Sequence, residues 1–275
     1  MIYKIGLVLL FGVLGGALLA ISFVNPYSGK ISLSEFVLQL SGSRGEFALG
    51  LSMFELVSLI TRMIPIYLFE IYFGTALYRH FCTASIYVFS RYPKRIRWYL
   101  HETLSVGAIA CLFQIVILAT AIFLTIIRFQ LQTDWVGIVL LAYHFIIHTA
   151  WLYSMTLLVN LLAISIGSSA SFMVVFGIQI VSITLLGCMG TFQKYMDTTA
   201  FFDILLIINS ISHLILGWHS SNYEAINQRL NSPYLMLDLK HSILLIIAFS
   251  VIITLLGALF VKKHDLIFAD SEKEV

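Results

Sequence analysis

Two histidines, His144 and His148, lie four residues apart in an otherwise apolar stretch. Residues four apart share one face of an α-helix, so this pair could bind a metal ion or relay protons. A metal site needs more ligands, and the chain has neither an HExxH motif nor a third ligand that the sequence identifies. Two interpretations stay open, a metal or proton site and a histidine pair hydrogen-bonded within a helix bundle, and we favour the second.

The three cysteines, Cys82, Cys111 and Cys188, are scattered and form no CxxC pair. Their spacing indicates neither a disulfide framework nor a zinc site. The chain also has no GxxxxGK[ST] phosphate loop, since its only Gly-Lys pair, residues 29–30, is followed by Ile31. If ATP drives this protein, another chain must hydrolyse it.

The composition determines which elements can carry these residues. Hydrophobic residues make up 60% of the 275 residues and charged residues 11%, whereas a soluble domain has roughly 45–50% and ~25%. The mean hydropathy is +0.96. The net charge of +2 is too small to favour nucleic acid as a partner. A soluble globular domain is excluded, and the chain is predicted to be an integral membrane protein.

Six runs reach the roughly 20 residues that cross a bilayer core. They predict an all-α integral membrane protein with one transmembrane domain over residues 1–275. The first run is longer than a signal-peptide core and ends without a small-residue cleavage site, so we expect an uncleaved anchor. The predicted spans are residues 5–24, 56–77, 104–127, 136–164, 172–189 and 242–261.

Charge distribution orients the spans, because Lys and Arg near span ends stay on the cytoplasmic side. The segment 79–102 holds five cations and no acid before Glu102. With six spans, both termini and this segment share one side, which we expect to be the cytoplasm at the plasma membrane. Residues 25–55 and 190–241 are then outer loops, the first with short helices outside the bilayer.

The residues around the basic segment form a known pattern. The second span ends in Glu-Ile-Tyr-Phe-Gly-Thr from Glu70, and Ser-Arg-Tyr-Pro-Lys-Arg-Ile-Arg-Trp follows from Ser90. This resembles the permease subunits of type-2 ATP-binding-cassette (ABC) exporters. The chain departs from that family at Pro93, which follows the Ser-Arg pair, and at His101-Glu102, where a Lys is common.

The resemblance implies that a cytoplasmic coupling helix between the second and third spans docks on a separate ABC ATPase subunit. It implies a dimer with a second copy of the chain or a related permease, membrane lipids around it, and no cofactor on this chain. The chain would then be a transport subunit and not an enzyme. The coupling residues carried over are Glu70, Gly74, Thr75, Ser90, Arg91, Arg95 and Trp98.

The resemblance also implies amphipathic substrates, such as a peptide, a bacteriocin or a lipid-like molecule, and a role in export or immunity. Short helices that dip back toward the bilayer would form an external gate with Trp218, His213 and His219. An ordinary interfacial anchor explains the same residues equally well. Arg62 is a weaker candidate for substrate contact.

Physical reasoning alone leaves the basic segment with two interpretations. Its aromatic residues and cations suit either a docking face or a helix in the lipid headgroup region. Two other functional classes also stay open for the chain. One is a non-transporting immunity or sensor protein, and the other is an intramembrane metalloenzyme that uses His144 and His148.

Overall fold

The computed structural model describes residues 2–26, 28–42, 52–87, 95–193, 199–230 and 237–263. Within these residues, six helical stretches are long and apolar enough to cross a membrane. The prediction of an all-α, multi-pass membrane protein is therefore confirmed. The six stretches are Ile5–Phe23, Phe54–Cys82, Arg95–Arg128, Trp135–Ile166, Ser168–Met189 and Leu239–Lys262.

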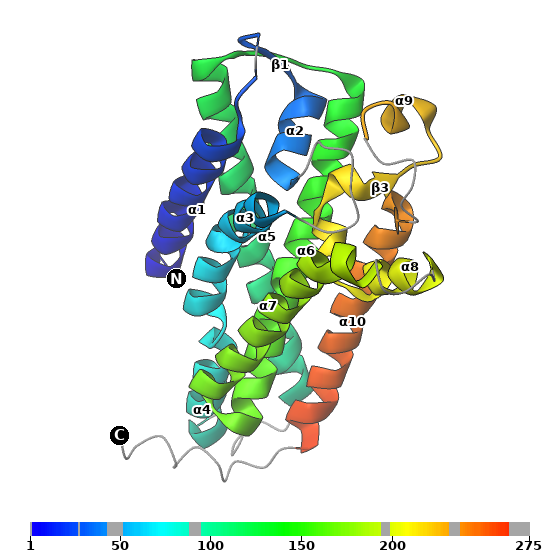
Figure 1. The fold of residues 1–275 in the computed structure, drawn as a ribbon. Helices are drawn as coiled ribbons and strands as arrows, with labels where there is room; N and C mark the ends of the chain where they lie inside the picture. Colours follow the sequence, from blue (N-terminus) through cyan, green and yellow to red (C-terminus); the bar gives the residue numbers. More distant parts are fainter. Residues whose placement is uncertain are drawn as a thin grey trace.

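Figure 1 shows how the elements follow one another along the chain. The helices that form the spans are α1 (Ile2–Phe23), α3 (Met53–Phe73) with α4 (Ala76–Tyr87), α5 (Arg95–Arg128), α6 (Trp135–Ile166), α7 (Ser168–Gln193) and α10 (Leu239–Lys263). Shorter elements lie between them: β1 (Lys30–Ser32), α2 (Leu33–Ser41), β2 (Gln130–Gln132), α8 (Thr199–Ile208), the 3₁₀ turns η1 (Ser212–Leu214) and η2 (Leu216–Trp218), β3 (His219–Ser220), α9 (Glu224–Asn227) and β4 (Leu237–Asp238).

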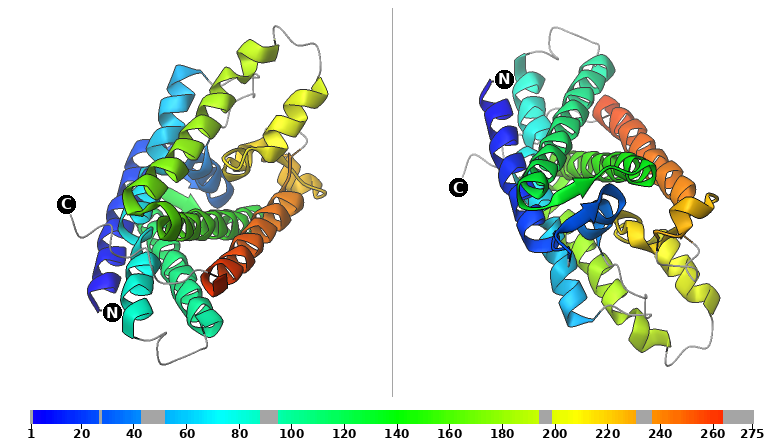
Figure 2. Two further views of the ribbon diagram at one scale, coloured as in Figure 1. Left: turned by 90° about the horizontal axis from the view of Figure 1, so that it is seen from below. Right: turned by 90° about the horizontal axis from the view of Figure 1, so that it is seen from above.

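Helix α6 is the centre of the bundle. It packs against α2, α3, α4, α5, α7 and α10, and the views along the bundle in Figure 2 place it between α5, α7 and α10. Its sequence is apolar around the whole circumference, as expected for a helix with neighbours on every side. Trp151, Leu152 and Leu157 are fully buried in it.

Helix α1 lies directly on α5 because its contact face is made of glycines. A side chain at Gly12 would collide with Val116, and one at Gly16 would collide with the carbonyl oxygen of Ile117. Small residues four apart let two membrane helices approach closely. The missing side chains therefore fix where α1 sits.

Helix α2 lies inside the bundle. Seven of its nine residues are buried, and it packs against α1, α6 and η2. Residues 25–55 were expected to form a loop with short helices outside the bilayer. The short helix is present, and it is buried within the protein because its apolar residues pack into the space beside α6.

A buried helix must find partners for the backbone groups at both ends. At the start of α2, the Asp134 carboxylate accepts a hydrogen bond from the backbone N–H of Ser34 (3.0 Å), and its other oxygen accepts from Gly137 of α6 (3.2 Å). One aspartate thus caps two helices.

At the other end of α2, Arg62 of α3 donates from Nε to the carbonyl of Leu40 and from Nη2 to that of Gln39, both at 3.0 Å. Its guanidinium also lies 3.8 Å above the Phe23 ring. The carboxylate and the guanidinium sit at the helix ends where the helix dipole favours them. The sequence made Arg62 a weaker candidate for substrate contact. In the structure it donates hydrogen bonds to the end of α2.

The segment between α8 and β3 also folds into the bundle. Every residue from 211 to 219 is buried, and η1 and η2 pack against α6 and α2 respectively. Strand β3 pairs in parallel with β4, just before α10. Residues 190–241 are thus only partly a surface loop.

Helix α5 is longer than a bilayer core requires. Its 34 residues extend roughly 51 Å at 1.5 Å per residue, against a core of about 30 Å. Arg95, Arg97 and Glu102 lie in its first turns, and the next charged residue is Arg128 at the far end. The charged side chains of α5 thus lie at its two ends, while Tyr99 in the first turns is fully buried.

The shared cap yields a stability prediction. Asp134→Ala leaves two buried N–H groups without an acceptor, so we expect the free energy of unfolding to fall by about 2 kcal/mol. Thermal unfolding in maltoside micelles measures it. Glu55→Ala removes a similar cap from the exposed start of α3 and should cost clearly less. Equal losses would contradict a special role for the buried cap.

Candidate functional site

Glu70 is a buried acidic residue within the second span. Its side chain is 1% exposed, and Gln179 of α7 donates from Nε2 to both carboxyl oxygens, at 2.9 and 3.0 Å. An ionisable group at such a place is costly and is commonly functional. The side chain reaches across to α7 and not to the protein surface, so any part that it has in coupling is indirect.

Four residues after Glu70, the second span is interrupted. Gly74 and Thr75 separate α3 from α4, and we call these two residues the α3–α4 break. The N–H of Gly74 donates to the carbonyl oxygen of Glu70 at 2.6 Å. A side chain at Gly74 would press on Val159 of α6. The predicted residues Glu70, Gly74 and Thr75 thus meet at one structural feature.

Asn160 of α6 holds the two sides of the α3–α4 break together. Its Oδ1 accepts hydrogen bonds from the N–H groups of Leu77 (2.8 Å) and Tyr78 (3.1 Å) at the start of α4. Its Nδ2 donates to the carbonyls of Phe73 at the end of α3 (3.3 Å) and of Thr156 (2.7 Å). One fully buried amide therefore closes both open helix ends.

The remaining predicted coupling residues follow α4. Ser90 and Arg91 lie outside the described residues. Arg95 and Trp98 begin α5, and the Trp98 ring lies 6.1 Å from that of Phe81 in α4. The described parts of the expected coupling segment, 79–102, therefore belong to the end of α4 and the start of α5, which pack together.

The histidine pair of α6 is held inside the bundle. The two rings stack at 3.8 Å. His144 Nε2 contacts Gln114 Nε2 of α5 at 3.4 Å, and His148 Nδ1 lies 2.9 Å from the carbonyl of His144. Among the residues that the structure describes, no group of three metal-binding side chains occurs. These contacts favour the interpretation as a hydrogen-bonded pair.

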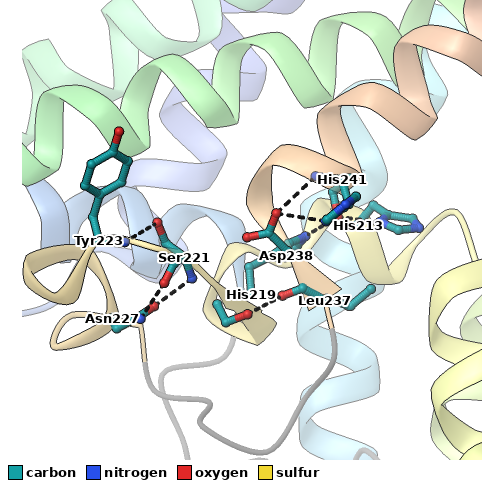
Figure 3. Close-up of polar contacts among 10 residues, drawn as sticks. His213, His219, Ser221, Tyr223, Asn227, Leu237, Asp238 and His241 are labelled. Atoms are coloured by element: carbon teal, nitrogen blue, oxygen red, sulfur yellow. Dashed lines mark hydrogen bonds and ion pairs between the residues drawn. The ribbon is translucent and has the colours of Figure 1, made fainter.

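The histidines of the expected external gate, His213 and His219, are labelled in Figure 3, and both contact Ser242 of α10. His213 Nδ1 lies 2.8 Å from Ser242 Oγ, and His219 Nε2 lies 2.9 Å from the same oxygen. The other ring nitrogens face backbone carbonyls, His213 Nε2 that of Ile207 (2.8 Å) and His219 Nδ1 that of Ile215 (3.0 Å). We call these three side chains the His–Ser–His cluster.

Both imidazoles of the cluster are neutral at neutral pH. Burial lowers the pKa of His213, and it lowers the pKa of His219 to about 4. The carbonyls accept only, so they fix the ring protons on the nitrogens that face them. Both remaining nitrogens then present a lone pair to one hydroxyl, which has a single proton to give.

Trp218 stands beside this cluster and is 1% exposed. The sequence favoured an interfacial position for it and for the two histidines. All three are buried within the protein, because η1, η2 and β3 turn inward between α2, α6 and α10.

Several residues of the site were not identified from the sequence. Gln179 and Asn160 are polar residues inside apolar runs, Ser242 begins one, and buried polar groups in a membrane bundle need partners. That signal marks each of them as a candidate. It does not say which helix supplies the partner.

Comparison with known proteins finds no match, whether among family models, curated proteins or solved structures.

The closure of the α3–α4 break yields a second prediction. Asn160→Leu leaves the N–H groups of Leu77 and Tyr78 buried without an acceptor, so the free energy of unfolding should fall by at least about 2 kcal/mol. Thermal unfolding in micelles measures the loss. Ser165→Ala, at an exposed position of the same helix, is the control and should be near neutral. A neutral Asn160→Leu would show that Asn160 does not stabilise the break.

The His–Ser–His cluster yields a prediction about pH. The folded-state pKa of His219, about 4, lies below its unfolded value of about 6.5, so the unfolded chain binds more protons between these values. The stability contributed by the neutral ring is present above pH 6.5 and is lost as the pH falls through about 4. From pH 7 to pH 5 the loss from this residue should be ~2 kcal/mol.

His219→Gln should therefore flatten the dependence of the unfolding temperature on pH across this interval. His101→Gln serves as the control, since its side chain lies at an exposed position of α5 and its replacement should leave the slope nearly unchanged. A His219→Gln variant with the wild-type slope would contradict the burial of a neutral imidazole.

Proposed function

We propose that this chain is the membrane-spanning permease subunit of an ATP-driven exporter. It works as a dimer with a second copy or a related permease, and a separate ABC ATPase subunit supplies the energy. Its substrates are amphipathic molecules, among them peptides, bacteriocins or lipid-like compounds. The chain itself binds no ATP and catalyses no reaction.

The observation that carries the proposal is the interrupted second span. Helix α4 is a separate helical piece after the α3–α4 break, and Asn160 forms hydrogen bonds with both sides of that break. The end of α4 and the basic start of α5 lie next to each other. A force applied at that end reaches α6 through Asn160, and it reaches α7 through Glu70 and Gln179.

A break of this kind suits the transmission of movement. Helix termini absorb changes of backbone dihedral angles, whereas a continuous helix moves as a rod. The α3–α4 break places such a joint between the basic end and the core of the bundle. The cytoplasmic position of that end rests on its cations, Arg79, Arg95 and Arg97 among them, under the positive-inside rule.

A non-transporting immunity or sensor protein would not require an ATPase partner. The decisive experiment is purification of the tagged chain from its native membrane, with mass-spectrometric identification of what accompanies it. We expect one chain with a GxxxxGK[ST] motif in stoichiometric amount, together with ATP-dependent release of phosphate. A chain that purifies without such a partner would support the immunity or sensor function instead.

The coupling residues yield a third prediction. Arg95→Glu combined with Trp98→Ala should leave the protein inserted but weaken its complex with the ATPase by more than tenfold, because arginine and aromatic anchors contribute about 2 kcal/mol or more each. Quantitative co-purification measures the loss, and substrate efflux should fall with it.

The matched control is Arg229→Glu with Trp135→Ala, which makes the same changes at exposed positions elsewhere. Unchanged binding and transport in the Arg95 and Trp98 double variant would show that the basic segment only orients the spans and does not dock on an ATPase.

A further inference from the structure

A cavity of ≈630 Å³ opens beside the first turns of α10, between that helix, α8 and η1. Its volume is that of sites that hold one small amphiphile or a drug-sized molecule. It has a polar end and an apolar wall. Its lining residues are Ile207, His213, Leu237, Asp238, His241, Ser242, Leu244, Leu245, Ala248, Phe249 and Ile252.

The polar end of the cavity carries a single formal charge, the carboxylate of Asp238. Among the lining residues there is no Lys or Arg. Asp238 Oδ2 lies 3.0 Å from Nδ1 of His241 and accepts from the backbone N–H of that residue at 3.3 Å. Figure 3 shows Asp238, His213 and His241 grouped at the start of α10. The nearby cation Lys240 lies 5.4 Å from the Tyr223 ring.

The His–Ser–His cluster makes the same end rich in acceptors. Two neutral imidazoles and one hydroxyl bring one proton each to four contacts. One acceptor therefore remains without a donor in any arrangement of the protons. Two members of the cluster, His213 and Ser242, line the cavity.

The electrostatic surroundings of the cluster have the same sign. The carboxylate of Asp238 in β4 favours a positive charge near the His219 ring. A ligand group that brings donors and a positive charge therefore complements this end, whereas a phosphate or a carboxylate does not.

The apolar wall runs along the side of α10 that faces away from the bundle. Leu244 is 69% exposed, Leu245 39% and Ile252 53%. On a membrane-spanning helix such residues face lipid tails. The cavity is thus reached from within the bilayer, which fits an apolar chain that lies beside α10.

We infer that this cavity binds a membrane amphiphile with a primary ammonium head group and a single apolar chain. The head group lies between Asp238 and the His–Ser–His cluster, where an ammonium offers three donors and no acceptor, and the chain lies along Leu245 and Ala248. The inference deepens the proposed function. Only the step that makes this amphiphile the transported substrate rests on that function. Binding itself needs no ATPase.

Photo-crosslinking of the full chain in phosphatidylcholine nanodiscs tests the inference without transport. The probe is hexadecylamine with a diazirine in mid-chain, and mass spectrometry maps its adducts. We expect adducts on Leu245, Ala248 or Ile252 that hexadecylamine displaces and that hexadecanol and palmitate do not. Asp238→Asn should reduce the yield by about tenfold, since it removes a charge-assisted contact.

Glu224→Gln, at an exposed acidic position on α9, is the charge-matched control and should leave the yield unchanged. Ala248→Leu fills part of the apolar side of the cavity and leaves Asp238 unchanged, and it should also abolish the adducts. Equal displacement by hexadecanol, or a full yield in Asp238→Asn, would overturn the inference in favour of a groove that accepts any lipid chain. Displacement by a lysine-containing amphipathic peptide but not by hexadecylamine would overturn it as well.

Discussion

The structure depends on one constraint, that the polar groups at helix ends buried in an apolar bundle must find partners within the protein. At the ends of α2 and at the α3–α4 break, a side chain from elsewhere in the chain supplies these partners. Asp134 and Arg62 close the two ends of α2, and Asn160 closes the α3–α4 break. Such side chains fix short elements in place that apolar contacts alone would leave free to slide, since apolar contact has no direction. The few polar residues of the bundle thus define its shape.

The same constraint accounts for a difference between the two ends of the molecule, one tied together by hydrogen bonds and the other charged. Around α2, η1 and η2 the chain is buried and tied by hydrogen bonds to α3, α6 and α10. At the other end, α4 and the start of α5 carry charges and are connected to the bundle through Asn160 and the packing of α4 on α6. The proposed export function would need both, a firm frame around a path and a part that can be driven.

The sequence predicts the six spans well, because the length and apolarity that define a span are the physical conditions for crossing the bilayer. It does not predict α2 as a buried element. Nine residues are too few to read as a span, and their burial depends on a space that α6 and η2 create. The grouping of Glu70 with Gly74 was predicted, since both lie on one helix and its end. Gln179 was not, because no pattern relates a position on α7 to one on α3 that is 109 residues away. For the same reason, the contacts of Ser242 with His213 and His219 were not predicted.

The shared cap at Asp134 also bears on how the chain is made. Arg62 stands only 22 residues from its partner in α2 and can reach it soon after the second span leaves the ribosome. Asp134 follows Ser34 by 100 residues, which corresponds to about 5–20 s of synthesis. During that interval Arg62 can hold the carboxyl end of α2, and Ser32 caps the N–H of Glu35, but the N–H of Ser34 still lacks its acceptor. The amino end of α2 therefore reaches its final hydrogen bonding only when the residues that begin the fourth span have been made.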